Sequence, residues 1–221
     1  MSKLSLSSIL IFVAISTCIG YLEYGYFRTP INTPFMETEQ TTVFHSIPLS
    51  EIVQGNMQED GIPSIDDPTF ESVGLADVYL NDAGSGLMVQ VDGRSRFYPF
   101  QLLVWHEIVN DTFRGKSLLI TYSPLCAQGM VFERAIGEKE YTFGASGRLW
   151  NNNMLMIDHE TNSLWSQALA EAVVGDRTGA KLVRYPTRII TWSTFKHVFP
   201  NGEVLSRETG STRDYTQDPY D

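Results

Sequence analysis

The sequence GLMVQVDGRSRFYPF, residues 86–100, carries the clearest structural signal in the chain. Residues 86–91 are rich in apolar and β-branched side chains, which is typical of a strand. Asp92-Gly93 is a common two-residue hairpin turn, so residues 95–98 are predicted to return as the second strand. This stretch therefore predicts an antiparallel hairpin with one buried face.

A helix is predicted to follow this hairpin directly. Pro99 suits the first position of a helix because its fixed φ is already helical and its missing N–H is not needed there. Leu102, Trp105 and Val109 then recur at helical spacing. We therefore predict one short helix over residues 99–110.

The rest of the chain alternates short β-like runs with turn signals. Further strands are predicted at residues 117–122, 129–134, 140–143, 154–157 and 181–185, and further helices at residues 164–174 and 191–199. With 43% hydrophobic and 19% charged residues the composition is that of a folded domain, which excludes a disordered chain or a coiled coil. The predicted fold class is α+β, as a β-rich single domain with a few short helices over residues 61–221.

The N-terminus predicts one transmembrane helix before this domain. Residues 4–22 are nineteen residues without a charge, which as a helix would span roughly 28 Å, close to the hydrocarbon thickness of a bilayer. Lys3 precedes the run, which favours a cytoplasmic N-terminus and a domain on the extracytoplasmic side. Residues 1–27 are thus predicted to be a membrane anchor or signal segment. Two alternatives stay open: a cleaved signal peptide ending at Ala14-Ile15-Ser16, which would give a secreted protein, and a buried helix of a soluble domain.

The negative charge is concentrated in one segment. The formal net charge is -10, and residues 29–93 contain no Lys or Arg. We predict an acidic tether over residues 28–60 that could meet a basic membrane-protein partner. Because the chain has no basic stripe, nucleic-acid binding is excluded.

His106-Glu107-Ile108-Val109-Asn110 resembles the H-E-x-x-H zinc helix, but Asn110 stands where the second zinc ligand should be. A zinc metalloprotease is therefore excluded. On the predicted helix, His106 and Asn110 would share one face. They could cap the helix and satisfy nearby backbone, or His106 could point into a pocket as a ligand or proton carrier.

Cys126 allows two further hypotheses. Thiolate, thioether and imidazole are soft ligands that suit copper, so a metal site is conceivable. Its predicted ligands are His106, Cys126, Met130 and Met156. The alternatives are a buried free cysteine among methionines that fill core gaps, and an enzyme in which Cys126 is a nucleophile with His106 as its base.

Several ordered blocks resemble a family known as domain of unknown function 3179. They are residues 62–68 (IPSIDDP), 105–111 (WHEIVND), 121–126 (TYSPLC), 143–147 (FGASG), 151–156 (NNNMLM), 163–167 (SLWSQ) and 206–220, which ends in RDYTQDPY. Ser123 departs from the family pattern, which usually has cysteine there, so a Cys-x-x-Cys metal or redox pair is absent. The resemblance implies relatedness over residues 61–221 and no chemistry.

These observations favour an exported, membrane-anchored domain that binds a ligand or metal. Its alternatives are a structural accessory subunit of a membrane complex and an enzyme that uses Cys126 and His106. The residues predicted to form its pocket are His106, Glu107, Asn110, Cys126, Ser146, Trp165 and Gln167.

Overall fold

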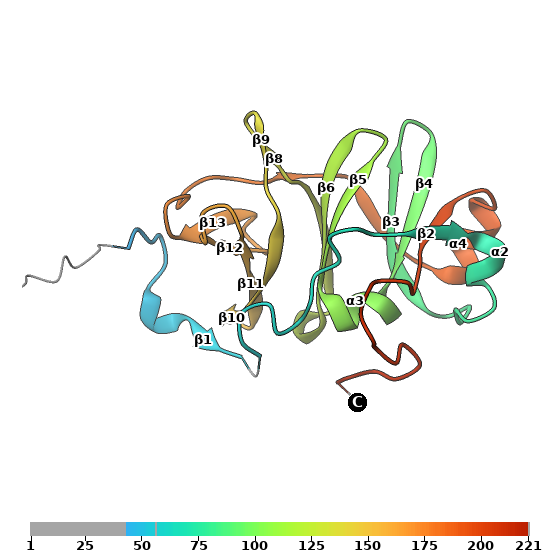
Figure 1. Cartoon of the computed structure of the whole chain (residues 1–221), viewed down its shortest axis with the longest axis horizontal. Coiled ribbons are helices and arrows are strands. Elements are labelled where there is room, and N and C mark those ends of the chain that lie inside the picture. Colours follow the sequence, from blue (N-terminus) through green and yellow to red (C-terminus); the bar gives the residue numbers. More distant parts are fainter. Residues whose placement is uncertain (1–42, 56, 221) are drawn as a thin grey trace, which may run out of the picture. The chain divides into compact units, whose positions relative to one another are not determined.

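In a computed structural model that describes residues 43–55 and 57–220, three β-sheets stack as successive layers (Figure 1). Sheet A has the strand order β1-β10-β11-β12-β13, sheet B has β14-β7-β6-β5, and sheet C has β15-β3-β4-β16-β2. A small hairpin of β8 (Ala135–Ile136) and β9 (Lys139–Glu140) projects from sheets A and B. The predicted β-rich domain with short helices is confirmed for these residues.

Sheet C contains the predicted hairpin. Strands β3 (Ser85–Val91) and β4 (Arg94–Pro99) pair antiparallel around Asp92 and Gly93, whose positive φ values of 46° and 74° fit a tight hairpin turn. The sheet is completed by β2 (Phe70–Ser72), β15 (Thr187–Thr191) and β16 (Glu203–Leu205), and its outer face is covered by α2 (Val73–Ala76) and α4 (Trp192–Val198). Helix α4 confirms the helix predicted at residues 191–199.

The helix predicted over residues 99–110 is shorter in the structure. Helix α3 (Phe100–His106) begins after Pro99, but Glu107 has a φ of 57° and ends it. Residues 108–113 then form strand β5 (Ile108–Phe113), which pairs with the next strand. The prediction that His106 and Asn110 share a helical face is therefore wrong, because the β-branched pair Ile108-Val109 enters a sheet.

Sheet B is the middle layer and is buried on both faces. It consists of β5, β6 (Lys116–Ser123), β7 (Gln128–Glu133) and β14 (Val183–Arg184), with the 3-10 helix η2 (Pro124–Cys126) after β6. Leu118 and Ile120 of β6 pack against sheet C, whereas Leu119 between them packs against sheet A. Burial on both faces explains why this strand is apolar without alternation.

Sheet A contains a second correction. It consists of β1 (Val53–Gln54), β10 (Phe143–Trp150), β11 (Asn153–Asp158), β12 (Leu164–Ser166) and β13 (Glu171–Val174). The helix predicted at residues 164–174 is thus two strands joined by a turn in which Ala170 has a φ of 57°. Burial of Trp165 and Ala172 against sheet B outweighs the helical propensity of this alanine-rich stretch.

Residues 43–55, predicted as part of the acidic tether, contact the domain. The Ser46 amide donates to the Val173 carbonyl at 2.9 Å, Ile47 is buried, η1 (Leu49–Glu51) follows, and β1 pairs with β10. Among the residues that the structure describes, no helix has the length and apolar character to span a membrane. The predicted span at residues 4–22 lies outside the described residues.

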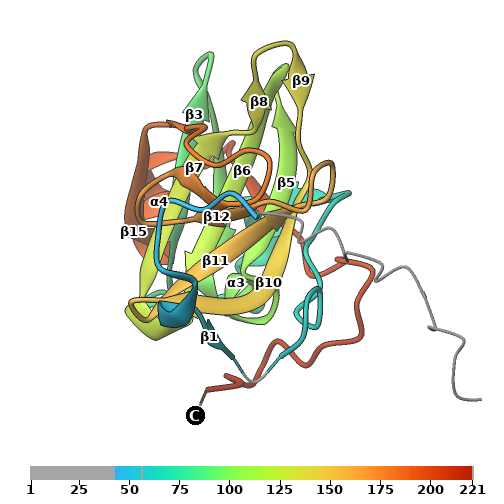
Figure 2. The ribbon, with the colours of Figure 1, turned by 90° about the vertical axis from the view of Figure 1, so that its left-hand side faces the viewer.

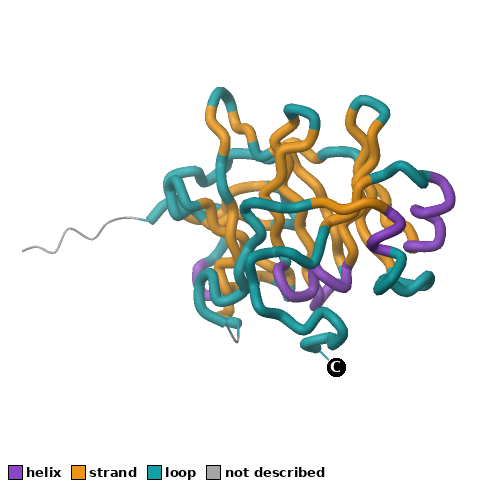
Figure 3. Tube along the Cα trace, turned by 45° about the vertical axis from the view of Figure 1, so that its right-hand side comes forward, coloured by secondary structure: helices purple, strands orange, loops and turns teal. Residues whose placement is uncertain are grey.

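The C-terminal segment, residues 206–220, contains no helix or strand. It leaves sheet C after β16 and runs back past α3 as an extended arm (Figures 1 and 2), and Figure 3 shows that it is loop up to the marked C-terminus. This path brings the end of the chain next to the junction between α3 and β5.

Candidate functional site

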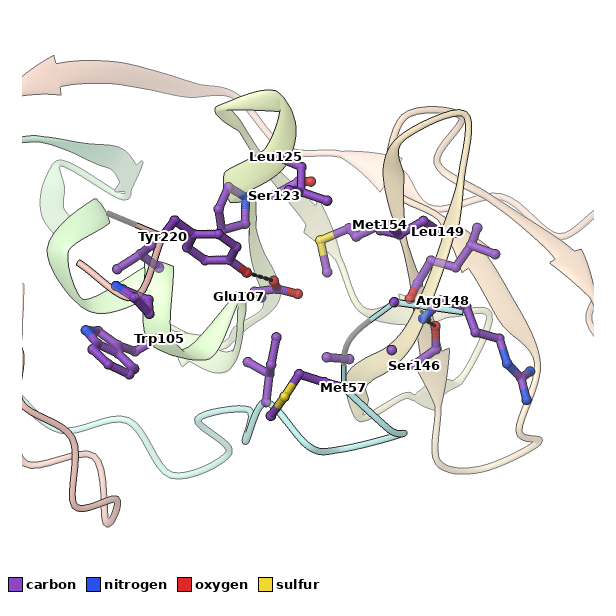
Figure 4. A pocket seen from close by; sticks show the side chains of 18 of the residues that line it. Met57, Trp105, Glu107, Ser123, Leu125, Ser146, Arg148, Leu149, Met154 and Tyr220 are labelled. Carbon is purple, nitrogen blue, oxygen red and sulfur yellow. Dashed lines mark hydrogen bonds between the residues drawn. The ribbon is translucent and has the colours of Figure 1, made fainter. Parts of the chain in front are cut away.

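A pocket of about 540 Å³ lies where sheets A and B meet, beside the end of α3 (Figure 4). Its walls come from α3, η2, β10, β11, the segment after β1 and the C-terminal arm. The lining is mainly apolar and includes Met57, Val104, Leu125, Leu149, Met154 and Leu155. This mixture of apolar walls and few polar groups is typical of small-molecule sites.

A bulge in β10 shapes one rim of the pocket. The register with β11 shifts between Ala145 and Arg148, and Gly147 in the bulge has a φ of 69°. A Cβ atom on Gly147 would lie 2.2 Å from the Met57 carbonyl oxygen. Glycine is therefore required for the close approach that brings Met57 to the pocket rim.

Glu107 is the buried acid of the pocket. Its backbone is fixed at the helix-to-strand junction, because its amide donates to the Leu103 carbonyl at 2.7 Å and its carbonyl accepts from the Tyr122 amide at 2.8 Å. The residue is 9% exposed, and its carboxyl group accepts a hydrogen bond from the Tyr220 hydroxyl at 3.3 Å. Burial raises the pKa of Glu107 to about 7.

The C-terminal arm contacts Trp105, His106 and Glu107 in turn. The Trp105 indole donates to the Gln217 carbonyl at 3.0 Å, and the Arg213 guanidinium lies 5.5 Å from the centre of its ring. His106 contacts the Tyr215 hydroxyl, and Glu107 contacts the Tyr220 hydroxyl. Two sequence blocks about 110 residues apart, WHE and RDYTQDPY, thus form one side of the pocket together.

His106 serves the fold, because both of its ring nitrogens already have protein partners. Nδ1 lies 2.7 Å from the Pro63 carbonyl, which can only accept, so Nδ1 carries the proton in the neutral ring. Nε2 lies 2.6 Å from the Tyr215 hydroxyl, which donates to it. Burial lowers the pKa of His106 and so favours this neutral form. His106 therefore contacts protein groups through both ring nitrogens and is not among the residues that line the pocket.

The residues predicted to bind copper do not come together. Cys126 is exposed on η2, where its thiol donates to the Asn152 carbonyl at 3.1 Å. Met156 is buried in the core between sheets A and B, and Met130 packs against that core. No group of three His, Cys, Asp or Glu side chains suited to a metal ion occurs within residues 43–55 and 57–220. Within the described residues, His106 contacts Pro63 and Tyr215 while Cys126 contacts Asn152, and no hydrogen bond joins the two side chains.

Three other predicted pocket residues are structural. Asn110 makes two hydrogen bonds with the Phe143 backbone and joins sheet B to sheet A. The Trp165 indole donates to Asp158 at 2.7 Å, and Gln167 donates to the Thr121 hydroxyl at 2.9 Å. Each of the three is at most 5% exposed and does not line the pocket.

Glu107 and Ser146 are the two predicted residues that line the pocket. The Ser146 hydroxyl donates to the Leu155 carbonyl at 2.5 Å and accepts from the Arg148 amide, so it stabilises the bulge. Trp105, Arg213 and Tyr220 also line the pocket, although they are not among the residues predicted to form it. Their only sequence signal is membership of the quoted blocks, since nothing local indicates that these blocks meet.

Comparison with known proteins agrees with the resemblance of these blocks. No curated protein and no solved structure matches the chain. A family model described as "Protein of unknown function (DUF3179)" matches residues 59–221, which is well over half of the chain and includes Glu107 and the C-terminal arm. The chain is therefore a member of the DUF3179 family.

Proposed function

We propose that this chain is a ligand-binding domain, held on the extracytoplasmic side of a membrane by residues 4–22. Its pocket would take a small molecule with an apolar body and one polar group that reaches Glu107. The observation that carries the proposal is a buried carboxyl group in a mainly apolar pocket, with Tyr220 as its one hydrogen-bond partner among the described residues. A perturbed acid in such a cleft is a common mark of a functional site.

Binding is favoured over catalysis because the pocket wall lacks a nucleophile with an adjacent base. Among the described residues, Ser146 is engaged with Leu155 and Arg148, and the Ser123 hydroxyl has only the Cys126 sulfur, at 3.7 Å. Covalent catalysis needs a base in hydrogen-bond reach of the nucleophile. A mainly apolar site whose buried acid lies beside no activated nucleophile is better suited to hold a ligand than to transform it.

A matched pair of leucines tests the pocket. Leu125 lines it and is 59% exposed, whereas Leu169 lies outside it and is 50% exposed. Neutral apolar fragments should bind the full chain in nanodiscs, after blank nanodiscs are subtracted, in ligand-observed NMR. Leu125→Ser should weaken binding several-fold by removing roughly 1–2 kcal/mol of apolar contact, while Leu169→Ser should not. Equal effects of the two variants, or no binding at all, would contradict the proposal.

The membrane location is supported by the uncharged run at residues 4–22 and by Lys3 before it. The full chain should stay with the membrane pellet after alkaline extraction and should be digested by protease added from the extracytoplasmic side. A protein recovered in solution with a new N-terminus after Ser16 would instead show a cleaved signal peptide.

A further inference from the structure

We infer that the ligand of this pocket carries an ammonium group, which pairs with Glu107, on an apolar body that fills the space between η2 and β10. The inference rests on the proposed function and names its ligand class. It follows from three observations on the described residues: no cation lies beside Glu107, the two arginines that line the pocket lie elsewhere, and the walls are mainly apolar.

Glu107 has no cationic partner in the described part of the chain. Its carboxyl oxygen contacts the neutral Tyr220 hydroxyl at 3.3 Å, and no Lys, Arg or His nitrogen lies within 4.0 Å of it. Buried acids are normally paired with a cation or with several donors. The missing partner is therefore a group that the ligand can supply.

Two arginines line the pocket, but neither serves Glu107. Arg148 is exposed on β10, and Figure 4 shows its side chain directed away from Glu107. Arg213 comes from the C-terminal arm and lies over the Trp105 ring. The Arg213 Nε atom is buried without a hydrogen-bond partner, and its charge lowers the pKa of His106 rather than compensating Glu107.

An ammonium group would complete this arrangement better than a neutral or anionic group. It would form a charge-assisted hydrogen bond with ionised Glu107 in surroundings of low polarity, where such bonds are strongest. A hydroxyl would bring a donor without a charge, so it would leave the carboxylate without a counter-charge, and a carboxylate would face a buried acid. The apolar body would contact side chains such as Met57, Leu125 and Met154, which surround Glu107 in the pocket (Figure 4).

Three probes of equal chain length separate these classes: hexylamine, 1-hexanol and hexanoate. Their affinities for the full chain in nanodiscs of neutral lipid are measured by calorimetry at pH 5.5 and pH 8, with blank nanodiscs subtracted. Hexylamine should bind about tenfold or more tightly than hexanol at pH 8, since the ammonium group pairs opposite charges with ionised Glu107 whereas the hydroxyl brings no charge. Its affinity should rise with pH because Glu107, with a pKa of about 7, must lose its proton to form the pair.

Two variants locate the effect. Glu107→Gln keeps the shape of the side chain but removes its charge, so it should lose the preference for hexylamine over hexanol and the pH dependence of hexylamine binding. Glu171→Gln, a partly buried acid on β13 outside the pocket, should change neither. At pH 7, binding of hexylamine to the natural chain should also release about 0.5 proton per molecule bound, detected as a dependence on buffer ionisation enthalpy.

The outcomes separate the two proposals. If hexanol binds at least as tightly as hexylamine at pH 8, or if hexylamine binds more weakly as the pH rises, the ammonium assignment is overturned while ligand binding stands. If none of the three probes binds to the natural chain, both the assignment and the proposed function fail.

Discussion

Glu107 and Asp111 are buried acids four residues apart on the same segment, yet their surroundings are opposite. Asp111 is 2% exposed and accepts two hydrogen bonds from Arg96, both at 2.8 Å, and one from the Tyr98 hydroxyl at 2.6 Å. Glu107 is 9% exposed and accepts one, from Tyr220 at 3.3 Å.

The difference indicates that Asp111 stabilises the fold, whereas Glu107 can still accept hydrogen bonds from a ligand. Arg96 is itself fixed between the rings of Phe70 and Phe113, at 3.7 and 4.2 Å, so the Asp111 pair joins sheets C and B. A buried acid whose partners are complete has no capacity for a ligand. Glu107 keeps that capacity and faces a pocket, which is the basis of its proposed role.

The largest effect on stability should come from removing the charge of Asp111, which breaks its ion pair with Arg96. Asp111→Asn leaves Arg96 with only Glu203 to balance its charge, in a mostly buried position. We expect the free energy of unfolding in urea to fall by about 3 kcal/mol, as for other broken buried ion pairs. The matched exposed change Asp92→Asn should cost less than about 0.5 kcal/mol. Equal losses in the two variants would show that the Asp111 cluster does not hold the sheets together.

The stability that Glu107 contributes should depend on pH. Because the pKa of Glu107 is raised to about 7 from 4.5, the folded chain holds a proton that the unfolded chain releases. Its contribution to stability is present below pH 4.5 and is lost as the pH rises through 7, by up to about 3 kcal/mol. Glu107→Gln should therefore be more stable than the natural chain at pH 8 and similar to it at pH 4.5 in urea unfolding. A variant that is less stable at pH 8 would show that Glu107 is a structural acid like Asp111.

A smaller effect is expected where the C-terminal arm meets α3. In Tyr215→Phe the buried His106 Nε2 loses its donor, and the Thr209 hydroxyl loses its contact with Tyr215. This should reduce the free energy of unfolding by roughly 1–2 kcal/mol, the cost of one unsatisfied buried acceptor. Metal content of the purified chain should be unchanged, since His106 binds protein groups. A stoichiometric metal that disappears in this variant would contradict the assignment of His106.

The sequence could predict the elements that depend on local signals but not those that depend on tertiary contacts. The hairpin at residues 86–98 and the strand at residues 117–122 depend on local turn chemistry and apolar patterning, so both were predicted. The end of α3 could not be predicted, because Glu107 is turned out of the helix by strand pairing of Ile108 with Thr121. Likewise the strands at residues 164–174 form only because sheet B covers them.

Only some of the residues that line the pocket could be predicted, because the pocket is formed by long-range contacts. Of the predicted site residues, Glu107 and Ser146 line the pocket. The rest of the pocket joins residues separated by about 50 to 165 positions, from Met57 to Tyr220, and no local pattern indicates that they meet. His106 was assigned a chemical role because the sequence cannot show that Pro63 and Tyr215 already occupy both of its nitrogens.

The smallest expected effect is a change in the pKa of Glu107 when its hydrogen bond to Tyr220 is removed. The Tyr220 hydroxyl is its only hydrogen-bond donor among the described residues, and this bond lowers the pKa of Glu107 against the larger effect of burial. Tyr220→Phe should therefore raise that pKa further, by a few tenths of a unit, because a long bond to a half-exposed tyrosine contributes well under 1 kcal/mol. An NMR titration of the Glu107 carboxyl carbon measures the shift, with Tyr122→Phe as the control, since Tyr122 stacks on Phe100 and makes no side-chain bond to Glu107. A pKa that falls in Tyr220→Phe would mean that the arm mainly excludes water from Glu107, so that its departure solvates the acid, and the arm would then be the element that a ligand displaces.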